Sequence, residues 1–173
     1  MVTGERLAEQ AINGNYIGIP YKKLDCQGLI EQIIKDCGIR KPDGTVYNWR
    51  GSNSMYRNFY QWRGTIAECE KIYGIIPQGC LLFTRKNDGG EVAKGYTDGL
   101  GNFTHVGLYL GAPHGVIHST TGGVQWGSYQ DKRWSNISLL SFIDYTGKNT
   151  DNNIRDLINM IKSNINELER LVL

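Results

Sequence analysis

The sequence lacks long apolar runs and concentrated positive charge. No apolar stretch in its 173 residues approaches the roughly 20 that a membrane-spanning helix needs, so no membrane span is predicted. The start of the chain shows no basic segment followed by an apolar one, so no secretory signal peptide is visible. The net charge of +2 and the dispersed lysines and arginines do not make the basic face that binds nucleic acid. Nucleic acid is therefore not an expected partner.

The sequence is also poor in cysteine and histidine. Four cysteines are too few for a disulfide scaffold, and no CxxC pair accompanies the three histidines. We therefore expect no zinc site and no metal or organic cofactor. Cys37, Cys69 and Cys80 lie in apolar or helical contexts, where cysteine commonly behaves as a small buried hydrophobe. Cys26 is the cysteine whose context suggests chemistry.

The order of the predicted elements indicates an α+β domain, because helices come first and antiparallel strands follow. The segment 25–38 predicts an amphipathic helix, with Asp25 as its N-cap and Gly38 as its stop. Residues 39–64 mix turn signals with aromatic side chains and predict no clear boundary. The glycine-rich stretch 85–102 predicts a long exposed loop bordering a site. Helices are predicted over 3–12, 25–38 and 66–73, and strands over 80–84, 105–110, 116–119, 123–126 and 137–142.

The end of the chain differs from the rest. Six apolar residues follow one another at spacings of four and three, which predicts a helix with one narrow apolar stripe. They are Ile154, Ile158, Ile161, Ile165, Leu168 and Val172. We therefore divide the chain into a domain over 1–147 and a C-terminal amphipathic helix over 148–173. Three interpretations stay open: the helix packs on the domain, it mediates self-association through 154–172, or it is a stem for a partner domain.

Cys26 and two histidines form a candidate catalytic set. Cys26 lies in the first turn of the predicted helix, where free backbone N–H groups and the helix dipole favour a thiolate. His105 opens the most regular predicted strand, and His118 lies on the returning strand of the same hairpin, where it can share a sheet face with His105. One imidazole can then take the thiol proton while the other orients it.

Four strings of the sequence, in order, resemble motifs of the NlpC/P60 cysteine peptidases. Residues 24–30, LDCQGLI, look like the DCSGL motif, and residues 105–111, HVGLYLG, look like the HVGIYLG strand. Residues 117–119, IHS, fall where this family places its third catalytic polar residue, and residues 77–83, PQGCLLF, resemble the PGDLVFF strand. Residues 18–21, GIPY, resemble the start of the GxPYxWGG segment. The resemblance covers roughly residues 16–145.

The resemblance implies a papain-like fold, in which a nucleophile helix packs on an antiparallel sheet. It implies a peptidoglycan hydrolase with Cys26 as nucleophile, His105 as base and His118 as the residue that orients it. Tyr21 and Asp25 are assigned to the oxyanion and substrate side of the site. The implied partner is the stem peptide of the cell wall, cut between D-glutamate and the diamino acid. The implied place of action is the cell wall, reached by export, by lysis or on a phage particle.

The sequence departs from the motifs at three points. Gln27 replaces the usual Ser, Cys80 replaces the usual Asp, and the WGG loop after Tyr21 is missing. Residues 39–76 carry no motif of the family, and we expect them to shape substrate choice. Two alternatives remain: an N-acetylmuramoyl-L-alanine amidase, as in the related CHAP domains, and a non-catalytic wall-binding or phage-tail module. The complete set of Cys26, His105 and His118 favours an enzyme over the module.

Overall fold

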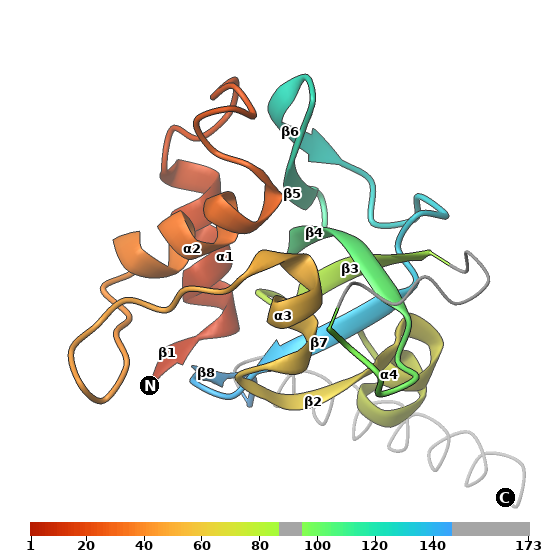
Figure 1. Cartoon of the computed structure of the whole chain (residues 1–173). Coiled ribbons are helices and arrows are strands. Elements are labelled where there is room, and N and C mark those ends of the chain that lie inside the picture. The colour runs from red at the N-terminus through yellow and green to blue at the C-terminus, as the bar shows by residue number, and fades with distance from the viewer. Residues whose placement is uncertain (87–94, 147–173) are drawn as a thin grey trace, which may run out of the picture.

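A six-stranded antiparallel sheet forms the centre of the computed structural model, which describes residues 1–86 and 95–146 (Figure 1). The strand order is β2-β7-β3-β4-β5-β6. A short parallel pair, β1 with β8, joins the start of the chain to the segment that follows β7. The strands are β1 (Val2–Thr3), β2 (Tyr60–Thr65), β3 (Leu81–Lys86), β4 (Asn102–Gly111), β5 (Gly115–Thr120), β6 (Gly123–Gly127), β7 (Asn136–Leu140) and β8 (Ile143–Asp144).

Four helices cover this sheet within the described residues: α1 (Gly4–Asn13), α2 (Cys26–Asp36), α3 (Gly51–Arg57) and α4 (Ile66–Tyr73). The first three share one apolar core with the sheet. A second core, which includes Cys69 of α4 and Trp134, lies on the other face. Figure 1 shows α1 and α2 on one side of the molecule and α4 on the opposite side. The sheet is therefore the middle layer between two sets of apolar contacts.

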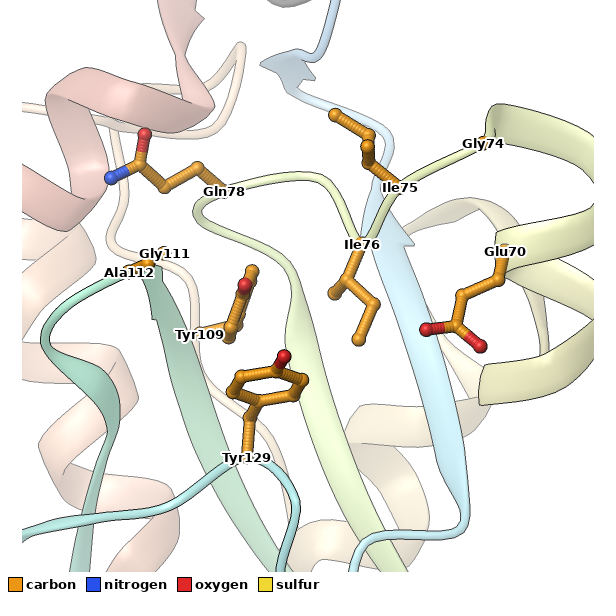
Figure 2. A pocket seen from close by; sticks show the side chains of 9 residues that line it. All are labelled: Glu70, Gly74, Ile75, Ile76, Gln78, Tyr109, Gly111, Ala112 and Tyr129. Atoms are coloured by element: carbon orange, nitrogen blue, oxygen red, sulfur yellow. The ribbon is translucent and has the colours of Figure 1, made fainter.

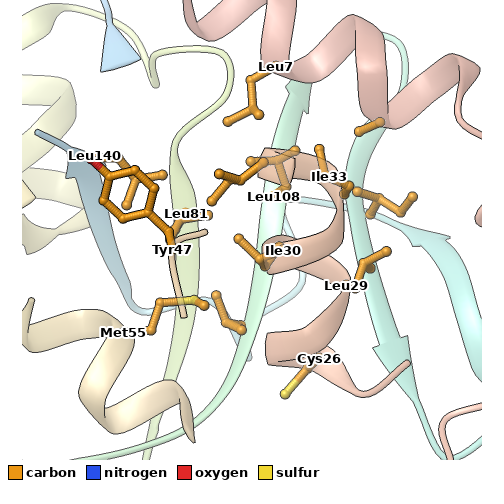
Figure 3. Packing of buried hydrophobic residues seen from close by; sticks show 14 of the residues in the cluster. Leu7, Cys26, Leu29, Ile30, Ile33, Tyr47, Met55, Leu81, Leu108 and Leu140 are labelled. Carbon is orange, nitrogen blue, oxygen red and sulfur yellow. The ribbon is translucent and has the colours of Figure 1, made fainter. Parts of the chain in front are cut away.

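Helix α2 packs on the middle of the sheet through one apolar stripe. Leu29, Ile30 and Ile33 are fully buried and meet Leu108 of β4 and Ile117 of β5 in the same core (Figure 3). Burying a side chain of this kind contributes about 1.5–3 kcal/mol. The stripe therefore holds the first residue of the helix against the sheet.

Both ends of α2 are defined by local chemistry. The Asp25 carboxylate accepts a hydrogen bond from the backbone N–H of Gly28 at 2.7 Å, as an N-cap does. Gly38, just past the C-cap, has a φ of +74°, a conformation that glycine adopts without strain.

Most of the predicted elements are present, with shifted ends. The predicted helices correspond to α1, α2 and α4, and the predicted hairpin to β4 and β5. The expected loop 85–102 is shorter than predicted, because β3 runs to Lys86 and β4 begins at Asn102. The helix α3 and the edge strand β2 have no counterpart in the prediction. β2 is half-exposed and irregular in register, so its sequence shows little apolar alternation. The domain boundary at 147 and the helix over 148–173 lie outside the described residues.

The described part of the chain holds no helix that is both long and apolar enough to cross a membrane.

Gln27, the residue that departs from the motif beside Cys26, clamps the segment before α3 onto α2. Its side-chain N–H groups donate to the Trp49 carbonyl at 2.6 Å and to Glu31 at 2.7 Å, and its oxygen accepts from the Gly51 backbone N–H. Glu31 in turn accepts from the Trp49 backbone N–H at 2.6 Å. A serine at position 27 is too short to make these contacts.

Helix α3 then anchors the start of β4. Ser52 donates to the Phe103 carbonyl at 2.6 Å, and Asn53 accepts from the Phe103 N–H at 2.9 Å. Arg57 pairs with Asp98 at 2.7 Å. The segment 39–65 therefore links α2 to the strand that carries His105.

Replacing Gln27 with Ala should lower the free energy of unfolding by about 1–3 kcal/mol, because half-buried hydrogen bonds to the backbone are lost. Chemical denaturation followed by circular dichroism measures this change. Gln32→Ala is the matched control, because Gln32 on the same helix makes a single exposed bond to Asp36. The control should change stability by about 0.5 kcal/mol or less. Equal effects of the two substitutions would show that the clamp does not stabilise the fold.

Candidate active site

Cys26 is the first residue of α2 and points its thiol at the start of β4. It is 7% exposed and belongs to the core that α2 shares with the sheet. Figure 3 shows its sulfur at the lower end of the helix, beyond the apolar stripe. A backbone N–H of Val106, the residue after His105, bonds the sulfur and favours its ionised form. The N-terminus of the helix thus brings the thiol to the backbone beside the predicted base.

The resting state of Cys26 differs from the thiolate that the helix N-terminus led us to expect. Burial raises the pKa of Cys26, and the negative charge of Asp25 raises it further. The N–H groups of Val106 and Gln27 and the hydroxyl of Tyr21 lower the pKa, as expected for an N-terminal helical position, but burial outweighs them. Desolvation disfavours the charged form of any thiol in such a position. At neutral pH the residue is therefore a thiol.

Tyr21 and Asp25 both lie beside the thiol, and they act differently. The Tyr21 hydroxyl bonds Cys26, and burial raises the pKa of Tyr21, so this hydroxyl stays protonated and can donate. The Asp25 side chain is engaged as the cap of α2 through Gly28. Its negative charge would repel an oxyanion, and the contact that the structure gives this side chain is the one that caps the helix.

His105 and His118 form a hydrogen-bonded pair. The register places His118 of β5 opposite Gly107 of β4, so both imidazoles lie on the same face of the sheet. His105 Nε2 lies 2.8 Å from His118 Nδ1. Because Nε2 is used in this bond, Nδ1 is the nitrogen that His105 can offer to a thiol.

Trp134 holds the two rings in place. Its ring stacks on His105 at 5.6 Å between centroids and meets His118 edge-on at 5.4 Å. Its indole N–H donates to the Ser128 carbonyl at 3.0 Å, which fixes the ring. Gly127 leaves the space for His118, because a Cβ at position 127 would lie 2.9 Å from His118 Nε2.

The histidine pair is neutral at physiological pH. Burial lowers the pKa of His105 to about 4, and His118 and the Arg133 guanidinium add to this effect. Burial and Arg133 also lower the pKa of His118, whereas Asp131 opposes them. A hydrogen bond between two neutral imidazoles needs one N–H: when His105 Nε2–H donates to His118 Nδ1, His105 Nδ1 carries no proton. In this tautomer His105 Nδ1 can accept a proton.

The described residues contain no hydrogen bond between the Cys26 thiol and the His105 ring. Catalytic hydrogen bonds are often long in ligand-free sites and tighten when substrate binds. Ser119 at the end of β5 donates to the Leu24 carbonyl at 2.6 Å, which ties the segment before Cys26 to the histidine hairpin. The thiol and the candidate base thus lie on segments that a hydrogen bond joins.

A cleft of about 550 Å³ opens at this end of the sheet, where β4 begins and β3 and β5 end. Tyr21 and His105 lie on it, together with Arg133 and Asp131, which form an ion pair at 2.8 Å. Thr84 also faces the cleft, and its hydroxyl is one of the buried polar atoms without a partner in the described structure. The cleft therefore offers donors and acceptors next to the candidate base.

Sequence reasoning did not find Trp134, Gly127, Arg133 or Thr84. They come from the end of β6, from the segment after it and from β3, and they reach the histidines only when the strands pair. No motif or periodicity marks them. Among the described residues, no group of three His, Cys, Asp or Glu side chains is placed to hold a metal ion.

One solved structure with a similar fold is the P60 domain of an antigen from M. avium subspecies paratuberculosis. The two chains are 16% identical, and the match has a TM-score of 0.52 and covers 82% of this chain and 98% of the other. A scan against protein-family models finds no match, and neither does a search of curated proteins. The likeness confirms the expected P60-like fold, a mixed structure of helices and an antiparallel sheet.

Replacing Asp25 with Asn should lower the pKa of Cys26, because asparagine keeps the helix cap and removes the charge that raises this pKa. The pH dependence of iodoacetamide alkylation, followed by mass spectrometry of the Cys26 peptide, measures the shift. In the unaltered chain the midpoint should lie above the ordinary thiol value of 9.0. Cys37 is the internal control, because Asp36 and Arg6 perturb its pKa and Asp25 does not. An unchanged midpoint at Cys26 would contradict the assigned cause.

Proposed function

We propose that this chain is a peptidoglycan hydrolase, a cysteine endopeptidase that cuts stem peptides of the bacterial cell wall. The observation that carries the proposal is the position of Cys26 at the start of α2, beside the strand that carries His105, which is paired with His118. A nucleophile, a base and a group that orients the base are the parts that acyl transfer requires. The P60-like fold and the motif resemblance point to the same substrate.

In the proposed reaction the thiol loses its proton as it attacks. Cys26 Sγ bonds to the amide carbon of the substrate while its proton passes to His105 Nδ1. The tetrahedral intermediate then breaks its C–N bond, and His105 returns the proton to the leaving amine. Water, activated by the same imidazole, hydrolyses the thioester and releases the acid. His118 keeps His105 in the reactive tautomer throughout.

The neutral resting states of Cys26 and His105 determine the step of the reaction at which charge develops. A raised thiol pKa and a lowered imidazole pKa disfavour a preformed thiolate–imidazolium pair. Charge then develops during the attack, where the backbone N–H of Cys26 and the Tyr21 hydroxyl are the proposed donors to the oxyanion. Losing one such donor typically slows a reaction about 100-fold or more.

The proposed bond lies between D-glutamate and the diamino acid, and the proposed place of action is the cell wall, with release by lysis or on a phage particle as one route. Segment 39–76 contributes to substrate choice in this proposal. Its clamp to α2 and its bonds to β4 place it between the two elements that carry Cys26 and His105.

Mass spectrometry of purified muropeptides tests the reaction directly. The unaltered chain should release fragments with a new amino terminus on the diamino acid, and Cys26→Ala should release none. Cys37→Ala is the matched control and should retain activity, because Cys37 lies at the far end of α2. A free muramic acid with L-alanine at the new terminus would favour the amidase. No cleavage of either bond would favour a non-catalytic wall-binding module.

The pH profile of cleavage tests the charge states. Activity should fall as the pH drops below about 4, where His105 takes up a proton and ceases to be a base. It should also fall at alkaline pH, beyond the ordinary thiol value of 9.0 because burial raises the pKa of Cys26, since an ionised thiol has no proton for the leaving amine. Circular dichroism at each pH separates these changes from unfolding.

A variant pair makes this test specific to His105. Arg133→Gln should move the acid limb to higher pH, because the Arg133 charge lowers the pKa of His105. Lys132→Gln, a change of the same kind at the exposed neighbouring position, should leave the limb in place. An acid limb that does not respond to Arg133 would show that His105 is not the titrating base.

A further inference from the structure

A second pocket lies at the far end of β4 (Figure 2). Strand alternation puts Tyr109 of this pocket on the same face of the sheet as His105 and His118. Its volume is about 430 Å³. Tyr109, four residues after His105, forms its floor, about 13 Å along the strand from the candidate base. None of the residues that line this pocket lines the cleft at His105. The lining includes the side chains of Glu70, Ile75, Ile76, Gln78, Tyr109 and Tyr129.

The walls of this pocket are held by backbone contacts. The Gly79 N–H donates to the Tyr109 carbonyl at 2.8 Å, and the Tyr109 N–H donates to the Cys80 carbonyl at 2.9 Å. The Gln78 amide donates to the Leu110 carbonyl. These bonds join the segment after α4 to the end of β4, so the pocket exists before any ligand arrives.

Three polar groups face this pocket without a partner. In the described part of the chain, neither the Tyr109 hydroxyl, the Tyr129 hydroxyl nor the Glu70 carboxylate makes a hydrogen bond or an ion pair. Tyr109 is only 8% exposed, and its hydroxyl is reached through the pocket. Burial and the neighbouring Tyr129 raise the pKa of Tyr109 to about 12, so this hydroxyl is neutral. In Figure 2 the Glu70 carboxylate extends from α4 toward the pocket, and the two tyrosine rings lie across from it.

We propose that this pocket binds a primary ammonium group carried on an aliphatic chain. Glu70 is the charged side chain of its lining, and it is negative. The Tyr109 and Tyr129 rings meet at 5.3 Å and 68°, and such ring faces attract a cation. Their hydroxyl oxygens accept hydrogen bonds from an ammonium, which offers three donors. Ile75 and Ile76 supply an apolar wall for the chain that carries the charge.

The site does not depend on the proposed reaction. It has its own lining, and Trp134 stands between it and the histidines: a Cβ at Gly107 would lie 2.9 Å from the Trp134 ring. A binding measurement with a probe that contains no stem-peptide bond therefore tests it separately from catalysis.

The probe is Nα-acetyl-L-lysine amide, with Nα-acetyl-L-norleucine amide as the matched compound that lacks the ammonium group. Titration into the full chain carrying 13C-labelled isoleucine methyl groups should shift the Ile75 and Ile76 signals saturably with the lysine probe, at about millimolar affinity. The norleucine compound should not shift them. Shifts of equal size with both compounds, or none with the lysine probe, would overturn the proposal.

Variants locate the binding. Glu70→Gln should weaken binding of the lysine probe about 10-fold, because one charge-assisted hydrogen bond is lost. Tyr109→Phe should weaken it by a smaller factor, since the ring stays and one acceptor is removed. Glu9→Gln removes the charge of an exposed glutamate on α1, and this variant should bind the lysine probe as the unaltered chain does. Unchanged affinity in Glu70→Gln, with the methyl spectrum showing a folded chain, would refute the assigned site.

Discussion

The burial of one apolar stripe of α2 against the sheet is the interaction on which the site depends. Leu29, Ile30 and Ile33 are fully buried, and together they outweigh the cost of bringing a polar helix end to the sheet. This packing fixes the position of Cys26 relative to β4. The Asp25 cap and the hydrogen bond from Ser119 to Leu24 hold the segment just before it. A small shift of the helix would move the thiol away from the strand that carries His105.

The same burial decides the chemistry. In an environment with little water, the neutral forms of both the thiol and the imidazole are favoured, which raises the pKa of Cys26 and lowers that of His105. The helix N-terminus lowers the pKa of Cys26, but desolvation raises this pKa by a larger amount. The proposed reaction between neutral groups needs a base with a defined tautomer, and the contact between His105 Nε2 and His118 Nδ1 can hold His105 in it. Gly127 leaves room for the His118 ring, and Trp134 packs against both rings and restricts their orientation.

The departures from the motifs have structural counterparts. Gln27 is long enough to reach Trp49 and Gly51, so the residue beside Cys26 holds a segment that carries no motif. Cys80, in place of the usual aspartate, is fully buried in the second core, where a charge would be costly. That core and the Tyr109 pocket lie on the face of the sheet away from α2. The first half of β4 contributes His105 to the cleft, and its last residues line the Tyr109 pocket.

Short-range pattern in the sequence determined α2, α4 and the β4–β5 hairpin, because helix periodicity, caps and strand alternation act over a few residues. It allowed His105 and His118 to share a face, and the register of the folded hairpin, with His118 opposite Gly107, decided that they do. What lies far apart in sequence was decided by the tertiary structure. β2 pairs with β7, more than 70 residues later, and its exposed edge position leaves no apolar alternation to read. The contacts of Trp134 with the histidines arise only on folding, and so does the net shift in the pKa of Cys26. That shift is a balance between burial and N–H groups from separate segments, and it depends on depth within the core, which local sequence does not encode.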